Sequence, residues 1–395
     1  MIKTLKSFDL KDKNILIRAD FNVPINNQVV TNNFRIKSSL STIKTCLDSG
    51  ASITLMSHLG RPNGKRCDDL SLVPVGEELA SLLEMPIKFS DDCISTDSID
   101  TSISLKAGEI HLLENLRFHP GEESNDYEFS SRLSRHGQIF INDAFGTAHR
   151  SHSSNIGVVP YFKNAGIGWL MDKEINYLTQ LIRKPNKPLT LVLGGAKIGT
   201  KLKLIENFLN IANNIIIGGG MAFTFLKALG KDVGGSLVDD AMISTAKNIM
   251  SKARAEGVRI VLPVDVMCSQ SLDNIEEEGP FFIEHIGDKL MGLDIGPKSV
   301  EKFKRILDKS ETILWNGPMG VFEKEEFEYG TKEIAKYLAI CAENDNSIII
   351  GGGDTAAAVE YFGLIKDMTH VSTGGGASLE LLCGKILPAL SILER

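Results

Sequence analysis

The chain has 395 residues, of which 43% are hydrophobic and 24% are charged, and its formal net charge is −7. A chain of this length exceeds one ordinary hydrophobic core, so two globular domains are expected. The negative net charge argues against nucleic acid as the main partner, and no apolar run approaches the roughly 18 residues that span a membrane.

The N-terminus and the cysteines predict a cytoplasmic protein. The first 14 residues, MIKTLKSFDLKDKN, lack the apolar middle of a signal peptide. The six cysteines are scattered, with no C-x-x-C pair and no metal-ligand spacing. This pattern is typical of reduced, buried thiols in a cytosol.

Short apolar runs alternate with helical patterns through the first half of the chain. Strands are predicted within residues 14–20, 51–59, 107–116 and 137–144. Between the first two runs, apolar residues recur at three- and four-residue steps, at Ile36, Leu40, Ile43 and Leu47. Such spacing predicts an amphipathic helix.

A helix that joins two domains is expected near residues 165–188. One helical face of this segment is apolar, with Met171, Ile175, Leu178 and Ile182. Pro185 and Pro188 close the segment. A plain surface helix has the same pattern, so the pattern alone leaves both interpretations open.

In the second half, four apolar runs end in glycine pairs or triplets. They lie within residues 189–197, 214–223, 346–363 and 370–382, and two further apolar runs occupy 259–267 and 311–317. Steady alternation of unbroken apolar strands with helices predicts parallel sheets with helices on both faces. The predicted fold class is therefore α/β, with two doubly wound parallel-sheet domains.

The glycines of the second half predict a phosphate-binding site. In doubly wound sheets, ligands sit beyond the carboxyl ends of the strands, where helix N-termini point. Turn chemistry alone explains any single Gly-Gly pair, but four such turns in one half favour a ligand site.

Asp354 and Thr355 follow Gly351–Gly353 directly. A carboxylate beside phosphate indicates an intervening Mg²⁺ or, alternatively, a helix N-cap. No G-x-x-x-x-G-K-S/T motif is present, and Lys197 and Lys201 supply positive charge instead.

Arginines at strand ends of the first half predict an anion site. They are Arg18, Arg61, Arg117 and Arg150, with His58 beside Arg61. A single surface arginine is usually solvated, but several at corresponding strand ends fall on one sheet edge. Guanidinium groups match phosphate and carboxylate oxygens. His149 and His152 lack acidic or cysteine neighbours, so no metal is expected there. A phosphoryl group passing between the two halves is the simplest chemistry that uses both sites.

A series of motifs resembles those of phosphoglycerate kinases in order and spacing. They are RADFNVP, SHLGRP, LLENLRFHPGEE, NDAFGTAHRSH, LGGAKIGTKLKLI, IIIGGGMAFTFLKALG, MGLDIGP, WNGPMGVFE, GGGDTAAAV and STGGGASLELL. The resemblance covers nearly the whole chain. It implies reversible, Mg²⁺-dependent phosphoryl transfer from 1,3-bisphosphoglycerate to ADP, giving 3-phosphoglycerate and ATP in glycolysis and gluconeogenesis. It also implies a monomer, and the composition already predicts a cytoplasmic protein without nucleic-acid or membrane partners.

The resemblance implies a domain organisation as well. Residues 1–165 would bind the phosphoglycerate, and 166–187 would form the inter-domain helix and hinge. Residues 188–378 would bind the nucleotide, and 379–395 would return to the first domain. Both main domains would be Rossmann-like, and hinge bending would close them over the two ligands.

Site residues follow from the resemblance, motif by motif. The implied phosphoglycerate-binding residues are Asp20, Phe21, Asn22, Arg35, His58, Leu59, Gly60, Arg61, Arg117 and Arg150. The implied nucleotide-binding residues are Gly194, Lys197, Lys201, Gly219, Gly292, Asn316, Pro318, Glu323, Gly352, Gly353, Asp354 and Thr355, with Asp354 as the Mg²⁺ ligand. The implied catalytic residues, which would act on the moving phosphoryl group, are Arg35, Lys201, Gly375 and Gly376.

Three positions depart from the usual pattern of the family. The segment before Arg35 lacks an acidic pair, Lys201 follows Ile-Gly-Thr instead of a serine and an acidic residue, and Cys383 stands where an acidic residue is common. None of the three removes a charged catalytic group.

Two other functions fit the same fold class. A nicotinamide-dependent dehydrogenase would require G-x-G-x-x-G after the first strand, and NILIRADFNVP has no glycine there. A nucleotide-binding interaction protein that has lost its chemistry would lack part of the catalytic set. Arg35, Lys201 and Asp354 are all present, which favours the enzyme.

Overall fold

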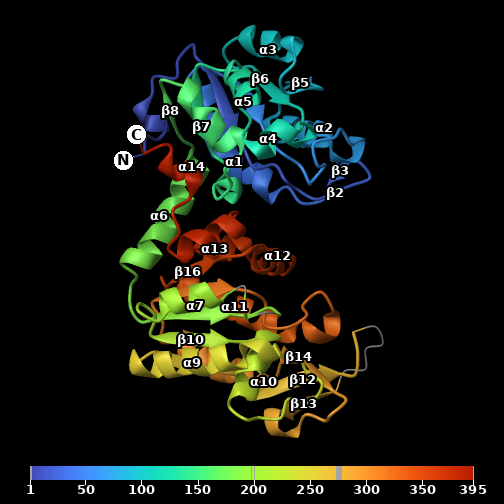
Figure 1. The fold of residues 1–395 in the computed structure, drawn as a ribbon, viewed down its shortest axis with the longest axis vertical. Coiled ribbons are helices and arrows are strands. Elements are labelled where there is room, and N and C mark those ends of the chain that lie inside the picture. The colour runs from blue at the N-terminus through green and yellow to red at the C-terminus, as the bar shows by residue number, and fades with distance from the viewer. Residues whose placement is uncertain (1, 197, 200, 273–277, 395) are drawn as a thin grey trace. The chain divides into compact units, whose positions relative to one another are not determined.

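The computed structural model describes residues 2–196, 198–199, 201–272 and 278–394. The chain divides into two compact units, Met1–Asn176 with Lys385–Arg395, and Tyr177–Gly384. The division falls inside helix α6 (Trp169–Arg183), so this helix begins in the first unit and ends in the second (Figure 1).

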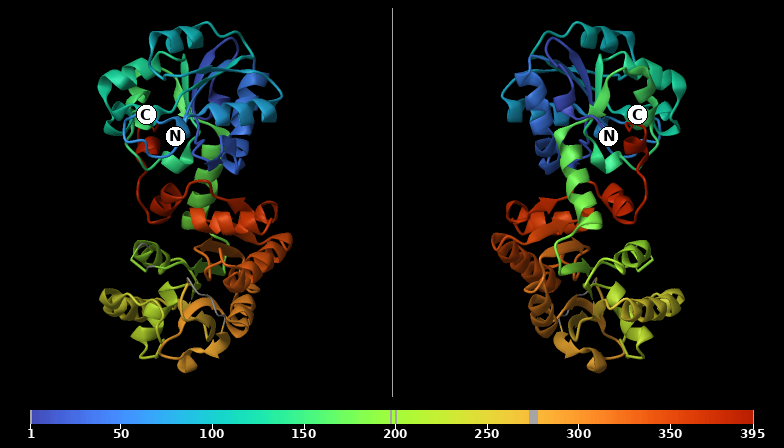
Figure 2. Two further views of the ribbon diagram at one scale, coloured as in Figure 1. Left: turned by 90° about the vertical axis from the view of Figure 1, so that its right-hand side faces the viewer. Right: turned by 90° about the vertical axis from the view of Figure 1, so that its left-hand side faces the viewer.

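The first unit is built on a six-stranded parallel sheet. The strand order is β5-β6-β4-β1-β7-β8. The strands are β1 (Asn14–Arg18), β4 (Ser52–Met56), β5 (Ile87–Ser90), β6 (Ile110–Leu113), β7 (Ile139–Asn142) and β8 (Ala165–Ile167). Helices cover both faces (Figure 2). They include α1 (Phe34–Asp48), α2 (Val73–Leu83), α3 (Thr96–Ile103), α4 (Pro120–Ser124) and α5 (Tyr127–Ser134).

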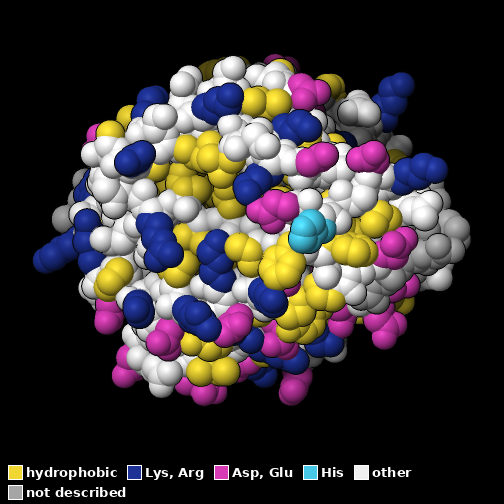
Figure 3. Space-filling view, turned by 90° about the horizontal axis from the view of Figure 1, so that it is seen from below, with side chains coloured by type: hydrophobic (Ala, Val, Ile, Leu, Met, Phe, Trp, Pro, Cys, Tyr) yellow, Lys and Arg dark blue, Asp and Glu magenta, His cyan; other side chains and the backbone are white. Residues whose placement is uncertain are grey.

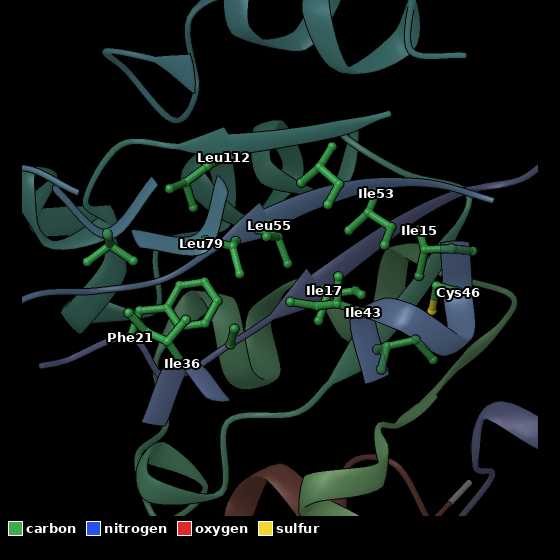
Figure 4. Close-up of a cluster of buried hydrophobic side chains, with 14 of the residues drawn as sticks. Ile15, Ile17, Phe21, Ile36, Ile43, Cys46, Ile53, Leu55, Leu79 and Leu112 are labelled. Atoms are coloured by element: carbon green, nitrogen blue, oxygen red, sulfur yellow. The ribbon is translucent and has the colours of Figure 1, made fainter. Parts of the chain in front are cut away.

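A hydrophobic core joins one face of this sheet to α1 and α2. Ile15 and Ile17 of β1 lie among Ile36 and Ile43 of α1 (Figure 4), and all four are almost fully buried. Because successive side chains of a strand point to opposite faces, Leu16 and Arg18 point to the other face. A charged residue therefore occupies a buried position at the carboxyl end of the central strand.

The second unit holds another six-stranded parallel sheet, in the order β11-β10-β9-β15-β16-β17. The strands are β9 (Leu189–Leu193), β10 (Asn214–Ile217), β11 (Arg259–Val261), β15 (Thr312–Asn316), β16 (Ser347–Ile350) and β17 (His370–Val371). The helices include α7 (Leu202–Phe208), α8 (Met221–Ala228), α9 (Ile243–Ala255), α10 (Pro297–Leu307), α11 (Tyr329–Glu343), α12 (Gly353–Tyr361) and α13 (Gly376–Leu382). The chain moves outward from β9 on one side and returns to its other side at β15. This reversal is the point at which open α/β sheets bind ligands.

The second unit also contains a small antiparallel sheet that the sequence analysis did not predict. Its strands are β12 (Asp265–Ser269), β13 (Glu278–Phe282) and β14 (Met291–Ile295), in the order β13-β12-β14. The predicted single strand within 259–267 is wrong, because the run splits into β11 and β12 in two different sheets. Pro263 lies between them and has no N–H for a sheet ladder.

The face of the structure around α9, α10 and the β12–β14 sheet is seen from below in Figure 3. Lys and Arg side chains there are interspersed with Asp, Glu and hydrophobic ones. Such a mixture is typical of a solvent-facing surface.

The end of the chain belongs to the first unit. Helix α14 (Pro388–Ser391) lies there, and its Ala389 N–H donates to the Ala148 carbonyl at 3.1 Å. In the described part of the chain, no helix has both the length and the apolar character that crossing a bilayer requires.

Candidate active site

The carboxyl ends of β1 and β4 meet at one edge of the first sheet, where their loops are tied together. Asp20, just after β1, is 3% exposed and forms an ion pair with Arg35 at the start of α1. Asn22 accepts a hydrogen bond of 2.9 Å from the Gly60 N–H with its Oδ1. The loops therefore present one carboxylate and one guanidinium group at a fixed position.

His58 lies buried at the end of β4, against Arg18. The Arg18 Nη2 lies 3.1 Å from His58 Nδ1, and Arg18 itself is fully buried. Burial holds the pKa of His58 well below its usual value, and the nearby positive charges of Arg18, Arg117, Arg35 and Arg150 act in the same direction. His58 is therefore a neutral imidazole at this edge.

Arg117, which follows β6, is buried and incompletely hydrogen-bonded. Its Nη1 donates to the Gly60 carbonyl at 2.7 Å, and its Nε lies 3.2 Å from Glu123 Oε1 without hydrogen-bond geometry. Its Nη2 has no hydrogen-bond partner among the described residues. Burial and then the charge of Arg150 lower the pKa of Arg117 to about 10. Buried donors of this kind cost free energy until an acceptor arrives, so they favour an anion.

The other predicted residues of this edge differ in exposure. Arg150 is half-buried, and Arg61 is exposed. The side chains of Phe21 and Leu59 lie in the core. Their N–H groups already bind Ser57 Oγ at 2.9 Å and Asn115 Oδ1 at 3.2 Å. These two residues hold the loops in place, and their N–H groups are already used in bonds within the protein.

A buried carboxylate beneath this edge was not predicted from the sequence. Glu122, in α4, accepts from the Ser154 hydroxyl at 2.6 Å and from the Ser154 N–H at 3.0 Å. The Ser154 hydroxyl in turn accepts from Arg18 Nε at 2.9 Å. The one available signal was an arginine that ends an otherwise apolar strand, because a buried guanidinium group needs a counter-charge.

In the second unit, the glycine turns surround a cavity of about 450 Å³. The predicted residues that line it are Gly219, Gly292, Pro318, Glu323 and Asp354. Its remaining wall includes the apolar side chains of Leu237, Leu272, Met291, Leu293 and Val321, none of which was predicted as a site residue. An apolar wall with a few polar groups is typical of a site for a small organic ligand, and carboxylates can accept hydrogen bonds from hydroxyl groups of such a ligand.

Two of the predicted glycines are required by backbone geometry. A side chain at Gly194 would collide with the carbonyl oxygen of Pro318, because the turns after β9 and β15 pass close together. Gly352 has φ of +92°, and a Cβ there would lie 2.9 Å from Asn316 Nδ2. Only glycine allows these turns to approach each other as they do.

Lys201 and Asn316 connect the same turns. Lys201 Nζ donates to the Asn316 carbonyl at 2.6 Å, and Asn316 Nδ2 donates to the Gly351 carbonyl at 3.0 Å. Thr355 is fully buried, and its Oγ1 accepts the Gly317 N–H at 2.6 Å. Asn316 and Thr355 therefore hold the turns after β15 and β16 together and do not point into the cavity as free groups.

The remaining predicted residues lie at helix starts. Asp354 is exposed in the first turn of α12, and Gly376 begins α13 after Gly375, whose φ is +48°. Gly353 is the first residue of α12. Lys197 lies outside the described residues.

Three comparisons identify relatives of this chain. A family model described as phosphoglycerate kinase matches residues 5–385. The phosphoglycerate kinase of Thermosynechococcus vestitus is 45% identical over 394 residues, which is 100% of this chain and 98% of the relative. That of Chlorobium luteolum is 45% identical over 396 residues, which is 99% of both.

Solved structures agree with the sequence comparison. The phosphoglycerate kinase from Coxiella burnetii gives a TM-score of 0.88 at 37% identity, covering 100% of this chain and 99% of that one. The phosphoglycerate kinase from Pyrococcus horikoshii gives 0.85 at 31% identity, covering 100% and 98%. The predicted fold class is confirmed, with two parallel-sheet α/β units.

These matches define the chain as a kinase. It belongs to the phosphoglycerate kinase family.

Proposed function

We propose that this chain catalyses reversible, Mg²⁺-dependent phosphoryl transfer from 1,3-bisphosphoglycerate to ADP, giving 3-phosphoglycerate and ATP, in glycolysis and gluconeogenesis. Family membership supports the reaction. Arg117 supports the assignment of the phosphoglycerate to the first unit most strongly. It is a buried cation with an unused donor, and it lies beside Arg150 and His58.

On the phosphoglycerate side, the proposed contacts divide between the two ends of the substrate. Asp20 and Asn22 hold the hydroxyl and carboxyl end, and Arg35 reaches the phosphoryl group that moves. The fixed 3-phosphate is held by His58, Arg61, Arg117 and Arg150. Phe21, Leu59 and Gly60 shape the loops that carry these groups. The side chains of Phe21 and Leu59 are buried in the hydrophobic core, so they support the loops and do not bind the substrate.

On the nucleotide side, the apolar wall of the 450 Å³ cavity accepts the base. Glu323 holds the ribose. The backbone at Gly194, Gly219, Gly292, Pro318, Gly352 and Gly353 approaches the rest of the nucleotide. Lys197 and Lys201 meet the phosphates. Lys201, Gly375 and Gly376 act on the transferred group. Asn316 and Thr355 act by fixing the turns, since their side chains bond to the main chain.

The residues present fit a nucleotide-bound Mg²⁺. Asp354 is an exposed carboxylate on the cavity wall, and no group of three or more metal-ligating side chains occurs in the described segments. This donor set suits Mg²⁺, which binds through one or two carboxylates together with substrate phosphates and water. When bound, the ion would neutralise phosphate charge and thereby favour the approach of the phosphoryl acceptor.

The chemistry requires positioning and charge neutralisation, without a general base. The acceptor in the reverse direction is a carboxylate, which is already ionised near pH 7. Arg35 and Lys201 stabilise negative charge on the moving phosphoryl group, and helix N–H groups at Gly375 and Gly376 add donors.

We also propose the finer properties that the family implies. The enzyme is a cytoplasmic monomer, residues 166–187 act as the hinge, and the segment 379–395 returns to the first domain. Size-exclusion chromatography with light scattering tests the oligomeric state, because a mass of twice 43.2 kDa would contradict the monomer.

The reaction is tested by a forward assay. Purified protein, 1,3-bisphosphoglycerate and ADP should yield ATP, and the rate should fall to background when Mg²⁺ is chelated. Asp354→Asn should raise the Mg²⁺ concentration needed for half-maximal rate. Binding of ADP without any ATP formation would instead favour a nucleotide-binding protein that lacks catalysis.

A further inference from the structure

Four buried groups form a continuous hydrogen-bonded chain beneath the phosphoglycerate edge. Glu122 accepts from the Ser154 hydroxyl at 2.6 Å, and that hydroxyl accepts from Arg18 Nε at 2.9 Å. Arg18 Nη2 then lies 3.1 Å from His58 Nδ1. Arg18, Glu122 and Ser154 are fully buried, and His58 is 4% exposed. This chain links α4 to the ends of β1 and β4.

The direction of every bond in this chain follows from chemistry. A guanidinium group only donates, so Ser154 Oγ must accept from Arg18 and give its own proton to Glu122. For the same reason, His58 Nδ1 must accept from Arg18 Nη2. A histidine that accepts at Nδ1 cannot carry a proton there. If it is neutral, its proton is on Nε2.

The charges around His58 act in the same sense. Arg18, Arg117, Arg35 and Arg150 all disfavour the imidazolium form, and burial is the largest cause of the lowered pKa. Glu122 is separated from His58 by Ser154 and Arg18, so its negative charge is directed to the guanidinium group. The arrangement therefore leaves the His58 ring with one proton, which is on Nε2.

We propose that Arg18 is a positioning residue that holds His58 as the neutral tautomer protonated on Nε2, so that the ring meets the anionic substrate as an uncharged hydrogen-bond donor. This inference rests on the proposed function, which makes this edge the phosphoglycerate site. Arg18 is fully buried, and its Nε, Nη1 and Nη2 atoms bond to Ser154, Ala19 and His58, so it acts through His58 and not by touching the substrate.

This arrangement has a consequence for binding. In the other neutral tautomer, Nδ1 would carry the proton and Nε2 would carry a lone pair. The ring would then present an acceptor instead of a donor at Nε2. With Arg18 in place, the donor persists through the physiological pH range, and substrate binding does not depend on protonation of His58 near its ordinary pKa. The cationic part of phosphate recognition then comes from the arginines.

The first test needs only the unmodified protein without substrate. Protein labelled with ¹⁵N-histidine is examined by NMR between pH 5.5 and 8.5, and His58→Gln identifies the His58 signals among those of the eight histidines. The expected spectrum shows a bare Nδ1 and a protonated Nε2 throughout, with no titration. A protonated Nδ1, or titration near the ordinary histidine value, overturns the inference.

The second test removes the donor. In Arg18→Met, His58 should begin to titrate or populate the other tautomer, and KM for 3-phosphoglycerate should rise roughly tenfold or more, as expected for loss of a well-oriented hydrogen bond to a charged group. KM for ATP should stay within about a factor of two. Arg66→Met is the matched control, because Arg66 is exposed and its polar partners, Asp68 and the Asp91 carbonyl, do not belong to this chain of bonds. A folded Arg18→Met with unchanged His58 signals overturns the inference.

The two experiments separate this inference from the proposed function. If His58 has the expected tautomer and responds to Arg18→Met, but calorimetry detects no 3-phosphoglycerate binding, the proposed function fails and the positioning role stands. If the substrate binds but the tautomer is wrong, only the positioning role fails. Should Arg18→Met not fold, the spectrum of the unmodified protein still decides.

Discussion

Lys201 Nζ donates a hydrogen bond of 2.6 Å to the carbonyl oxygen of Asn316, the last residue of β15. The ammonium group is therefore held by the turn of a neighbouring strand in the second unit. Burial lowers the pKa of Lys201 to about 8, while the charge of Asp354 acts in the opposite direction. The lysine proposed to act on the moving phosphoryl group thus titrates within an accessible pH range in the free enzyme.

The first prediction concerns the pH profile. Below pH 8, Lys201 is protonated and can stabilise phosphoryl charge, and above pH 8 it loses that charge. Because kcat/KM reports ionisations of the free enzyme, kcat/KM for ADP should fall above about pH 8. Lys201→Arg should be slower but should lack this alkaline limb, since arginine stays charged. Lys203→Arg, a neighbouring exposed lysine, is the control. An unchanged limb in Lys201→Arg would remove Lys201 as its source.

The second prediction concerns Arg35, which forms an ion pair with Asp20. If Arg35 contacts the phosphoryl group mainly in the transition state, Arg35→Ala should lower kcat by about 10³-fold or more while KM changes much less. Steady-state kinetics give both constants, and Arg66→Ala provides an exposed arginine as control. A change confined to KM would exclude Arg35 from the catalytic residues.

The third prediction separates the two ligand sites. Arg61→Ala or Arg150→Ala should weaken 3-phosphoglycerate binding and leave ADP affinity within about a factor of two. Both arginines belong to the first unit, whereas every residue lining the 450 Å³ cavity belongs to the second. Calorimetry measures the two affinities independently. Equal losses for both ligands would mean that the division into two sites is wrong.

The fourth prediction concerns acid stability of the first unit. His111 and His136 are fully buried and share Ser102 Oγ, at 2.8 and 2.7 Å from their Nδ1 atoms. Burial is the main cause that lowers both pKa values to about 4. The unfolded chain therefore binds more protons than the folded one between about pH 6.5 and 4, so stability falls as pH falls through this window. Each histidine should cost about 2 kcal/mol between pH 7 and pH 5.

Urea denaturation at pH 7 and pH 5 measures this loss. The chain has two tryptophans, and Trp315→Phe leaves Trp169 as the reporter of the first unit. His136→Gln should be less stable at pH 7, because it loses its bonds to Ser102 and to the Cys93 carbonyl at 3.0 Å. It should also show a smaller change between the two pH values. An equal change in both proteins would contradict the assignment to His136.

The strands were predictable where an apolar run was long and uninterrupted. Ile15 to Ile17 and Ile348 to Ile350 are examples, and both are buried as expected for parallel strands covered on two faces. Strands β5 and β8 were not predicted. β5 has four residues with Lys88 among them, and β8 has three residues with Gly166 in the centre. Their place in the sheet depends on neighbouring strands, which a local pattern does not contain.

The candidate site shows a similar division. The glycine turns, the strand-end arginines and Asp354 could be predicted, because a few neighbouring residues are enough to identify a turn or a charge. In the apolar cavity wall, Leu237 and Leu272 come from separate loops, whereas Met291 and Leu293 belong to β14. All four look like ordinary core or surface residues in sequence. Glu122 and Ser154 are 32 residues apart. Their relation to Arg18 exists only after folding, so no spacing rule could have revealed it.

The last prediction is that neither ligand alone closes the enzyme fully, whereas both together do. Arg35 and Lys201 belong to different units, and helix α6 crosses the division between those units. If both side chains act on one phosphoryl group, the units must come together around it during the reaction. Water must also be excluded, because an acyl phosphate held beside these cations would hydrolyse. Closure before both substrates arrive would block entry, so each ligand should supply only part of the closing free energy.

Small-angle X-ray scattering on the free, singly bound and doubly bound protein measures the radius of gyration. It should decrease most in the ternary complex, with Arg35→Ala as a variant that still binds nucleotide but closes less. A radius that stays the same in the ternary complex would refute the hinge and leave the shared contact of Arg35 and Lys201 without a mechanism.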